Sequence, residues 1–108
     1  MELNEYQKKA LETAVYPECH KAVYPALGMN GEAGEVADKV KKVIRDKGGV
    51  FSEDDKKEIA KECGDVLWYV AVMSNDLGYT LNEIAEMNYE KLKSRQQRGK
   101  LCGSGDNR

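Results

Sequence analysis

Four stretches of helical periodicity, separated by short runs of helix-breaking residues, constrain this 108-residue chain more than any other feature. Within each stretch apolar residues recur every three or four positions, which is typical of an amphipathic helix. The stretches span residues 2–15, 25–45, 53–77 and 81–98. Proline occurs only at Pro17 and Pro25, and Gly48 with Gly49 ends the second stretch. No stretch alternates as a strand does, so we expect an all-α protein.

The predicted helix starts carry capping signals. Ser52 precedes three acidic residues, and Thr80 is followed three residues later by Glu83, the pattern of a capping box. Helices joined by short loops favour an antiparallel four-helix bundle-like domain. We expect this domain to cover residues 1–99, and we expect the glycine-rich, polar residues 100–108 to form a flexible C-terminal tail.

The composition excludes several classes of protein. A formal charge of −2 gives no electrostatic footprint for a nucleic acid, so we expect no nucleic-acid partner. No apolar run reaches the roughly 20 residues that span a bilayer, and the polar N-terminus is unlike a signal peptide. The three cysteines form no C-x-x-C pair, which favours free thiols in a reducing cytoplasm, or the host cytoplasm for a viral protein. With His20 as the sole histidine, a multi-histidine metal site is excluded.

Two pairs of acidic residues lie on consecutive predicted helices. Glu32 and Glu35 are one turn apart on the second helix, and Glu62 and Asp65 are one turn apart on the third. Each pair taken alone is better explained as solvated surface. If the two helices pack antiparallel, however, four carboxylates converge and raise one another's pKa. Hard divalent cations such as Mg²⁺ or Mn²⁺ relieve that repulsion with all-oxygen ligation.

Glycines stand beside these acids, at Gly31, Gly34 and Gly64. Glycine weakens a helix by about 1 kcal/mol relative to alanine, so its presence here calls for a reason. We expect the three glycines to keep bulk away from a crowded seam between the two helices. On that hypothesis, Gly34→Leu would be harmful.

The stretches "LGMNGEAGEVADKVKK" and "EIAKECGDVLWYV" resemble the MazG-like nucleotide pyrophosphohydrolases of the all-α NTP pyrophosphatase superfamily. The family signature is Glu-x-x-Glu on one helix and Glu-x-x-Asp on the next, and the resemblance runs from about residue 3 to residue 99. It implies hydrolysis of a nucleoside triphosphate to the monophosphate and pyrophosphate. It also implies that Glu32, Glu35, Glu62 and Asp65 bind Mg²⁺, with Mn²⁺ as a substitute, and that Glu35 accepts a proton from the attacking water. Many members have an acid where this chain has Gly31.

Asn88, Lys91 and Arg95 share one face of the fourth predicted helix. A solvated basic helix end explains them equally well. The resemblance implies that they contact the phosphates or the sugar, which suits cationic side chains. Lys39 and Lys42 could also reach a phosphate from the second helix, but we expect them to pair with nearby acids on the surface. Four residues are candidates for a pocket that binds the base: Tyr6, Gln7, Trp68 and Tyr69. For the aromatic ones, packing in the core or at a subunit interface is the alternative.

Apolar residues on several sides of the helices also predict self-association. Those that support it are Trp68, Tyr69, Val72 and Met73. The resemblance implies a homodimer or a dimer-of-dimers tetramer. Two other classes are alternatives to the enzyme: a non-catalytic helical interaction module that oligomerises, and a di-iron carboxylate bundle. The latter usually carries Glu-x-x-His motifs, which this chain lacks. The base and sugar of the nucleotide stay open.

Overall fold

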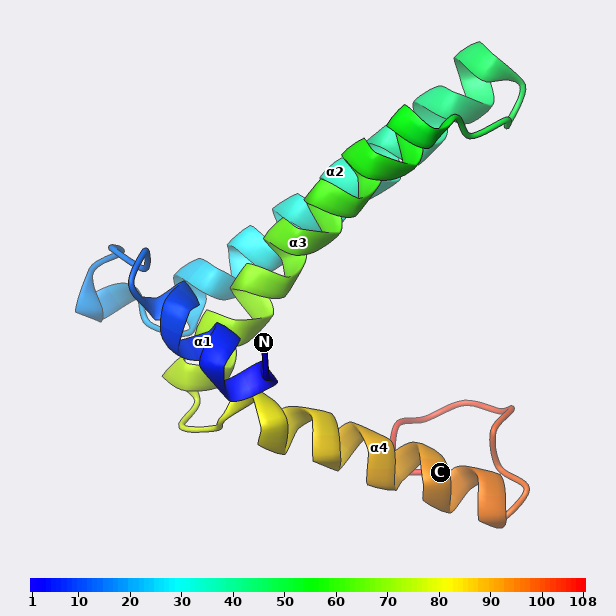
Figure 1. The fold of residues 1–108 in the computed structure, drawn as a ribbon. Helices are drawn as coiled ribbons and strands as arrows, with labels where there is room; N and C mark the ends of the chain where they lie inside the picture. The colour runs from blue at the N-terminus through cyan, green and yellow to red at the C-terminus, as the bar shows by residue number, and fades with distance from the viewer.

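The computed structural model describes residues 1–108 and contains α-helices and one short 3₁₀ turn but no strand (Figure 1). The elements are α1 (Leu3–Leu11), η1 (Glu18–His20), α2 (Val23–Lys47), α3 (Glu53–Asp76) and α4 (Leu81–Gln97). The all-α prediction is therefore confirmed. The first helix ends at Leu11 and not near Val15, because the amides of Glu12, Thr13 and Ala14 bond three residues back and tighten the last turn.

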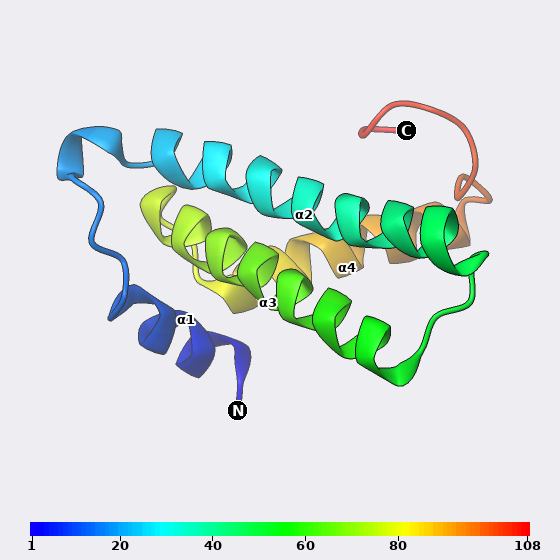
Figure 2. The same ribbon diagram turned by 90° about the horizontal axis from the view of Figure 1, so that it is seen from above.

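Helices α2 and α3 form a long antiparallel hairpin and lie side by side along most of their length (Figures 1 and 2). Gly48 ends α2 in the left-handed conformation with φ of 61°, which glycine adopts without steric cost. Ser52 starts α3 with the predicted capping box, in which its hydroxyl accepts from the Asp55 amide. The two acidic pairs therefore lie on helices that face each other, as the sequence predicted.

Helix α1 packs against the C-terminal half of α3, and the small apolar core lies where these two helices meet the start of α4. Its buried members are Ala10, Ala71, Val72 and Leu81. Val72 is completely buried in this core, so it is not available to contact a second copy, contrary to expectation. Only nine of the 108 residues are buried, which makes each tertiary contact in this core weigh heavily on stability.

The side chain of Gln7 ties α1 to the start of α4. Its Nε2 donates to the carbonyls of Ala71 and Tyr79, each at 3.1 Å. Its Oε1 accepts from the amide of Leu81 at 3.0 Å. Gln7 is 6% exposed, so the hydrogen bonds replace water for every group involved.

The remaining amides in the first turn of α4 are satisfied in a similar way. Asn4 on α1 accepts from the amide of Asn82 at 2.9 Å. Thr80 accepts from the amide of Glu83, whose side chain returns a bond to the Thr80 amide. The predicted capping box is confirmed. Gln7 and Asn4 of α1 accept hydrogen bonds from the Leu81 and Asn82 amides, which the capping box does not satisfy.

Helix α4 meets α1 and α3 near its start and then diverges from the hairpin, so that the chain has the shape of an open V (Figure 1). The radius of gyration is 16.7 Å, whereas a compact domain of this length has about 13 Å. The turn at Gly78, with φ of 84°, directs α4 away from the hairpin and does not return it along α3. The predicted four-helix bundle therefore does not close within one chain. None of the four helices combines the length and apolar content of a membrane span.

The glycines beside the acids do not provide the predicted clearance. A Cβ atom built on Gly31, Gly34 or Gly64 meets nothing within 4 Å. That hypothesis is wrong for the single chain, because these positions face outward and away from the packed seam. Close approach occurs instead at Gly28, where a Cβ atom would overlap the ring of Tyr69 on α3.

We expect Gly28→Ala to destabilise the protein by about 1–3 kcal/mol, because the added methyl forces α2 and α3 apart or displaces an aromatic ring. The matched control is Gly31→Ala, one turn along the same helix. It should raise the free energy of unfolding by about 0.5–1 kcal/mol through helix propensity alone. Urea denaturation of both variants measures the difference. Equal effects would show that Gly28 does not govern the packing of the hairpin.

Candidate metal centre

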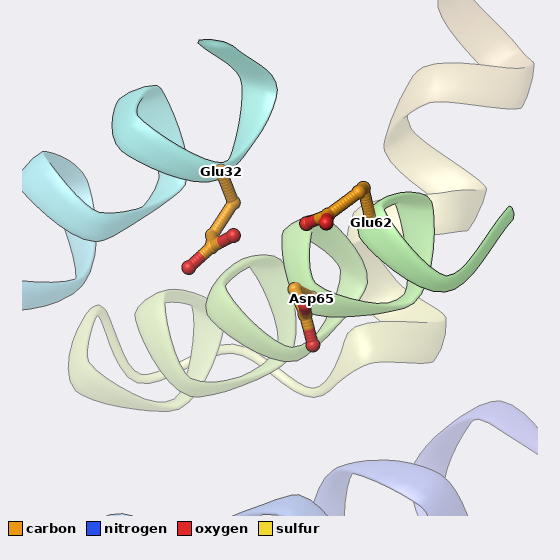
Figure 3. Close-up of side chains that lie close together, drawn as sticks. All are labelled: Glu32, Glu62 and Asp65. Atoms are coloured by element: carbon orange, nitrogen blue, oxygen red, sulfur yellow. The ribbon is translucent and has the colours of Figure 1, made fainter. Parts of the chain in front are cut away.

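Three carboxylates converge on the α2–α3 hairpin (Figure 3). Glu32 projects from α2 toward α3, which carries Glu62 and Asp65 one turn apart. One oxygen of each residue can be chosen so that all three lie within 4.8 Å of one another. The antiparallel pairing and the three-residue spacing together bring these side chains to one point, as the sequence predicted for them.

The electrostatics of this cluster fit a cation. Burial is the largest cause that raises the pKa of Glu32, followed by the negative charges of Asp65, Glu62 and Glu35. Lys39, which places Nζ 3.5 Å from Oε1 of Glu62, offsets part of that charge. A set of carboxylate oxygens is the donor set that Mg²⁺ and Mn²⁺ prefer, so the residues present fit such an ion.

The structure does not bring Glu35 into this group. It lies one turn beyond Glu32 on α2 and is exposed. Of the three acids that raise the pKa of Glu32, it has the smallest effect. The predicted four-carboxylate set is therefore seen as a cluster of three with a fourth acid nearby.

A cavity of about 400 Å³ adjoins the carboxylates. It is lined by Thr13, Glu32, Asp65, Trp68 and Tyr69. The indole Nε1 of Trp68 donates to Oγ1 of Thr13 at 2.9 Å, which fixes the plane of the ring. The rings of Trp68 and Tyr69 meet edge to face, 4.9 Å apart. Two of the clustered carboxylates and two aromatic rings therefore line the same cavity.

Two other candidates for a base pocket have structural roles. The amide of Gln7 is fully engaged in holding α1 to α4, and Tyr6 packs against the core. No structural role was predicted for Gln7, although a polar residue on the apolar face of a helix is a signal that could have indicated one. Lys42 pairs with Asp38 at 2.8 Å, as expected for a surface lysine. Lys39 also pairs with an acid, as expected, and its partner is Glu62 of the carboxylate cluster.

The predicted phosphate contacts on α4 lie elsewhere. Asn88 and Lys91 line a separate cavity of about 300 Å³ with Ile84, Met87 and Asp106. Arg95 shares their side of the helix and is 6% exposed beneath the C-terminal segment. Neither of these two cavities is lined by both these residues and the carboxylate cluster.

Comparison with known proteins decides the family. Residues 20–99 match the MazG nucleotide pyrophosphohydrolase domain, a range that contains both acidic pairs and all of α4. The chain belongs to the MazG family. The match ends at Gly99, one residue before the C-terminal segment 100–108.

A curated protein is similar to this chain over its whole length. It is the "Gene 37 protein" of Mycobacterium phage L5, which is 44% identical over 114 aligned positions that cover all of both chains. That name states no activity. No solved structure matches the chain significantly.

Proposed function

We propose that this MazG protein is a metal-dependent nucleoside triphosphate pyrophosphohydrolase that converts a (d)NTP to the (d)NMP and pyrophosphate. The observation that carries the proposal is the convergence of Glu32, Glu62 and Asp65 from two helices within the family domain. An interaction module has no need for three close carboxylates, because their mutual repulsion costs stability.

The roles of the residues follow from their positions. Glu32, Glu62 and Asp65 would hold Mg²⁺, or Mn²⁺ in its place. When bound, the ion would neutralise the phosphates and orient a water molecule. Attack by that water on the α,β-phosphoanhydride would form one P–O bond and break the bridging P–O bond, which releases the monophosphate and pyrophosphate. Glu35, which is exposed beside the cluster, is proposed to accept the proton of the water and to complete the ligand set when substrate is present.

The nucleoside is proposed to lie in the adjoining cavity, against Trp68 and Tyr69. Aromatic rings stack on any base, so this contact suits several nucleotides and leaves the base and sugar open. Trp68 is the sole tryptophan of the chain, so its fluorescence reports on this cavity.

We expect a bound triphosphate to change the Trp68 emission with a saturable dependence on nucleotide concentration. The measurement is a fluorescence titration of the native protein with Mg²⁺ and a triphosphate analogue whose α,β-bridge cannot be hydrolysed, so that no turnover occurs during the scan. Thr13→Val, which removes the hydroxyl that fixes the indole, should weaken the response. Nucleotide binding without any change in emission would place the base elsewhere.

Asn88, Lys91 and Arg95 are proposed to contact phosphate through charge-assisted hydrogen bonds.

We also propose a homodimer or a dimer-of-dimers tetramer. Large apolar side chains are exposed on three helices: Leu27 and Ile44 on α2, Leu67 on α3, and Met87 and Leu92 on α4. Such a surface is more typical of an interface than of a monomer. Light scattering should give at least twice the 12.1 kDa mass of one chain, and a monomeric mass would contradict the proposal.

The direct test is a panel of ribo- and deoxyribonucleoside triphosphates incubated with the purified protein and Mg²⁺, with products separated by ion-exchange chromatography. A monophosphate with pyrophosphate is expected from at least one nucleotide. A diphosphate with inorganic phosphate would indicate a different reaction. No hydrolysis of any nucleotide with Mg²⁺ or Mn²⁺ would favour an interaction module. We place the activity in the cytoplasm of the cell that makes the protein, including a phage-infected cell.

A further inference from the structure

The C-terminal segment, residues 100–108, turns back along α4 after that helix ends (Figures 1 and 2). Gly99 leaves the helix with φ of 66°, and the Lys100 amide donates to the Arg95 carbonyl at 2.7 Å. Arg108 then closes the segment into a loop. Its guanidinium donates to the carbonyls of Lys100, Leu101 and Gly105 at 2.8–3.1 Å.

This loop delivers one carboxylate to the basic face of α4. Oδ1 of Asp106 lies 2.7 Å from Nζ of Lys91 and 3.4 Å from Nη2 of Arg95. The same guanidinium nitrogen also donates to the backbone carbonyl of Asp106. The Arg95 side chain is only 7% exposed, and its side-chain partners belong to the loop.

The arrangement matches what a phosphate group would need. Lys91 and Arg95 are four residues apart on one helix face, so their like charges repel unless an anion lies between them. Carboxylates and phosphates both present anionic oxygens that accept hydrogen bonds from lysine and arginine. The cavity beside them, lined also by Asn88, has a volume of about 300 Å³, and Asp106 forms part of its wall. The loop and an external anion therefore compete for the same donors.

We propose that the C-terminal loop is a built-in competitor that occupies the Lys91–Arg95 pair with Asp106 and must be displaced before these residues can bind a phosphate ligand. The inference rests on the proposed function in one respect, the phosphate role of Lys91 and Arg95. It adds an autoinhibitory contact that lowers the apparent affinity for phosphate. Since Asp106 is 75% exposed and the ion pair is on the surface, the contact is weak enough to exchange.

The test is calorimetric titration of inorganic pyrophosphate into the full chain without divalent metal, so that turnover is not required. Asp106→Asn should lower the Kd for pyrophosphate about two- to fivefold, the range expected for loss of an exposed ion pair. Gly103→Val should act in the same direction while keeping the carboxylate. Gly103 has φ of 117°, which a valine rarely adopts, and a Cβ atom there would lie 3.4 Å from Arg108.

Two controls make the result specific. Asp54→Asn removes the same charge at the far end of the hairpin and should leave the Kd unchanged. Adding Lys91→Ala to Asp106→Asn should abolish the gain. Equal effects of Asp106→Asn and Asp54→Asn, no effect of Gly103→Val, or no pyrophosphate binding by any variant would overturn the proposal. A tighter Kd in a protein that hydrolyses no nucleotide would support the competing loop and reject the enzyme, so the two failures are distinguishable.

Discussion

We expect the Glu62→Gln variant to hydrolyse its nucleotide at least about 100-fold more slowly than the native protein. Glu62 is one of the three converging carboxylates, and glutamine keeps its size but removes the charge that holds a cation. The fold should survive, because the negative charge of Glu62 is one cause of the raised pKa of Glu32. Removing it relieves repulsion without creating a cavity.

The measurement is kcat from pyrophosphate release, with thermal unfolding followed by circular dichroism in EDTA. Glu58→Gln is the matched control, since this acid lies one turn earlier on α3, pairs with Lys61 at 2.9 Å and is outside the cluster. It should keep near-native turnover. Retained activity in Glu62→Gln would show that the cluster is not the metal centre.

Glu35→Gln separates two roles for the acid outside the cluster. If Glu35 acts only as the proton acceptor, the variant should lose turnover and keep its affinity for metal, because the three-carboxylate cluster is intact. If Glu35 is also a metal ligand when substrate is bound, the variant should lose both turnover and affinity for metal. Native turnover in this variant would remove Glu35 from the proposed mechanism.

Replacing Gln7 by methionine should lower the free energy of unfolding by about 3 kcal/mol. Methionine matches glutamine in length and helix propensity, so the difference reports the hydrogen bonds. It would leave the carbonyls of Ala71 and Tyr79 and the amide of Leu81 without the partners that Gln7 provides. Buried groups left unpaired cost about 1–3 kcal/mol each.

Urea denaturation measures this loss, and Gln96→Met on the exposed end of α4 is the control, with little change expected. The effect should appear as a lower midpoint with a similar m-value. A loss below about 0.5 kcal/mol would mean that water replaces the Gln7 amide and that α1 does not anchor α4.

Much of the fold followed from local sequence signals. Helical periodicity, the capping boxes at Ser52 and Thr80, and the glycine stop at Gly48 are determined by neighbours in the chain, so they were predicted with ends close to those observed. The angle of α4 was not predicted. It depends on the Gln7 side chain, which bonds to groups more than 60 residues away along the chain.

The candidate site divides in the same way. Glu32, Glu62 and Asp65 were placed together because three-residue spacing on paired helices sets their faces. Glu35 shares a helix face with Glu32, but helical spacing alone cannot say how far a side chain reaches across a seam. The predicted role of the glycines failed for a related reason. Only tertiary packing distinguishes Gly28, which lies against Tyr69, from Gly31, which faces open space.

The most direct test of the metal centre is a Mn²⁺ titration followed by electron paramagnetic resonance of the free ion, because it requires no knowledge of the substrate. The native protein should take up Mn²⁺, and added Mg²⁺ should release it. Glu62→Gln should take up much less than the native protein, whereas Glu58→Gln should match it. Equal Mn²⁺ uptake by the native protein and Glu62→Gln would contradict a metal centre built by Glu32, Glu62 and Asp65.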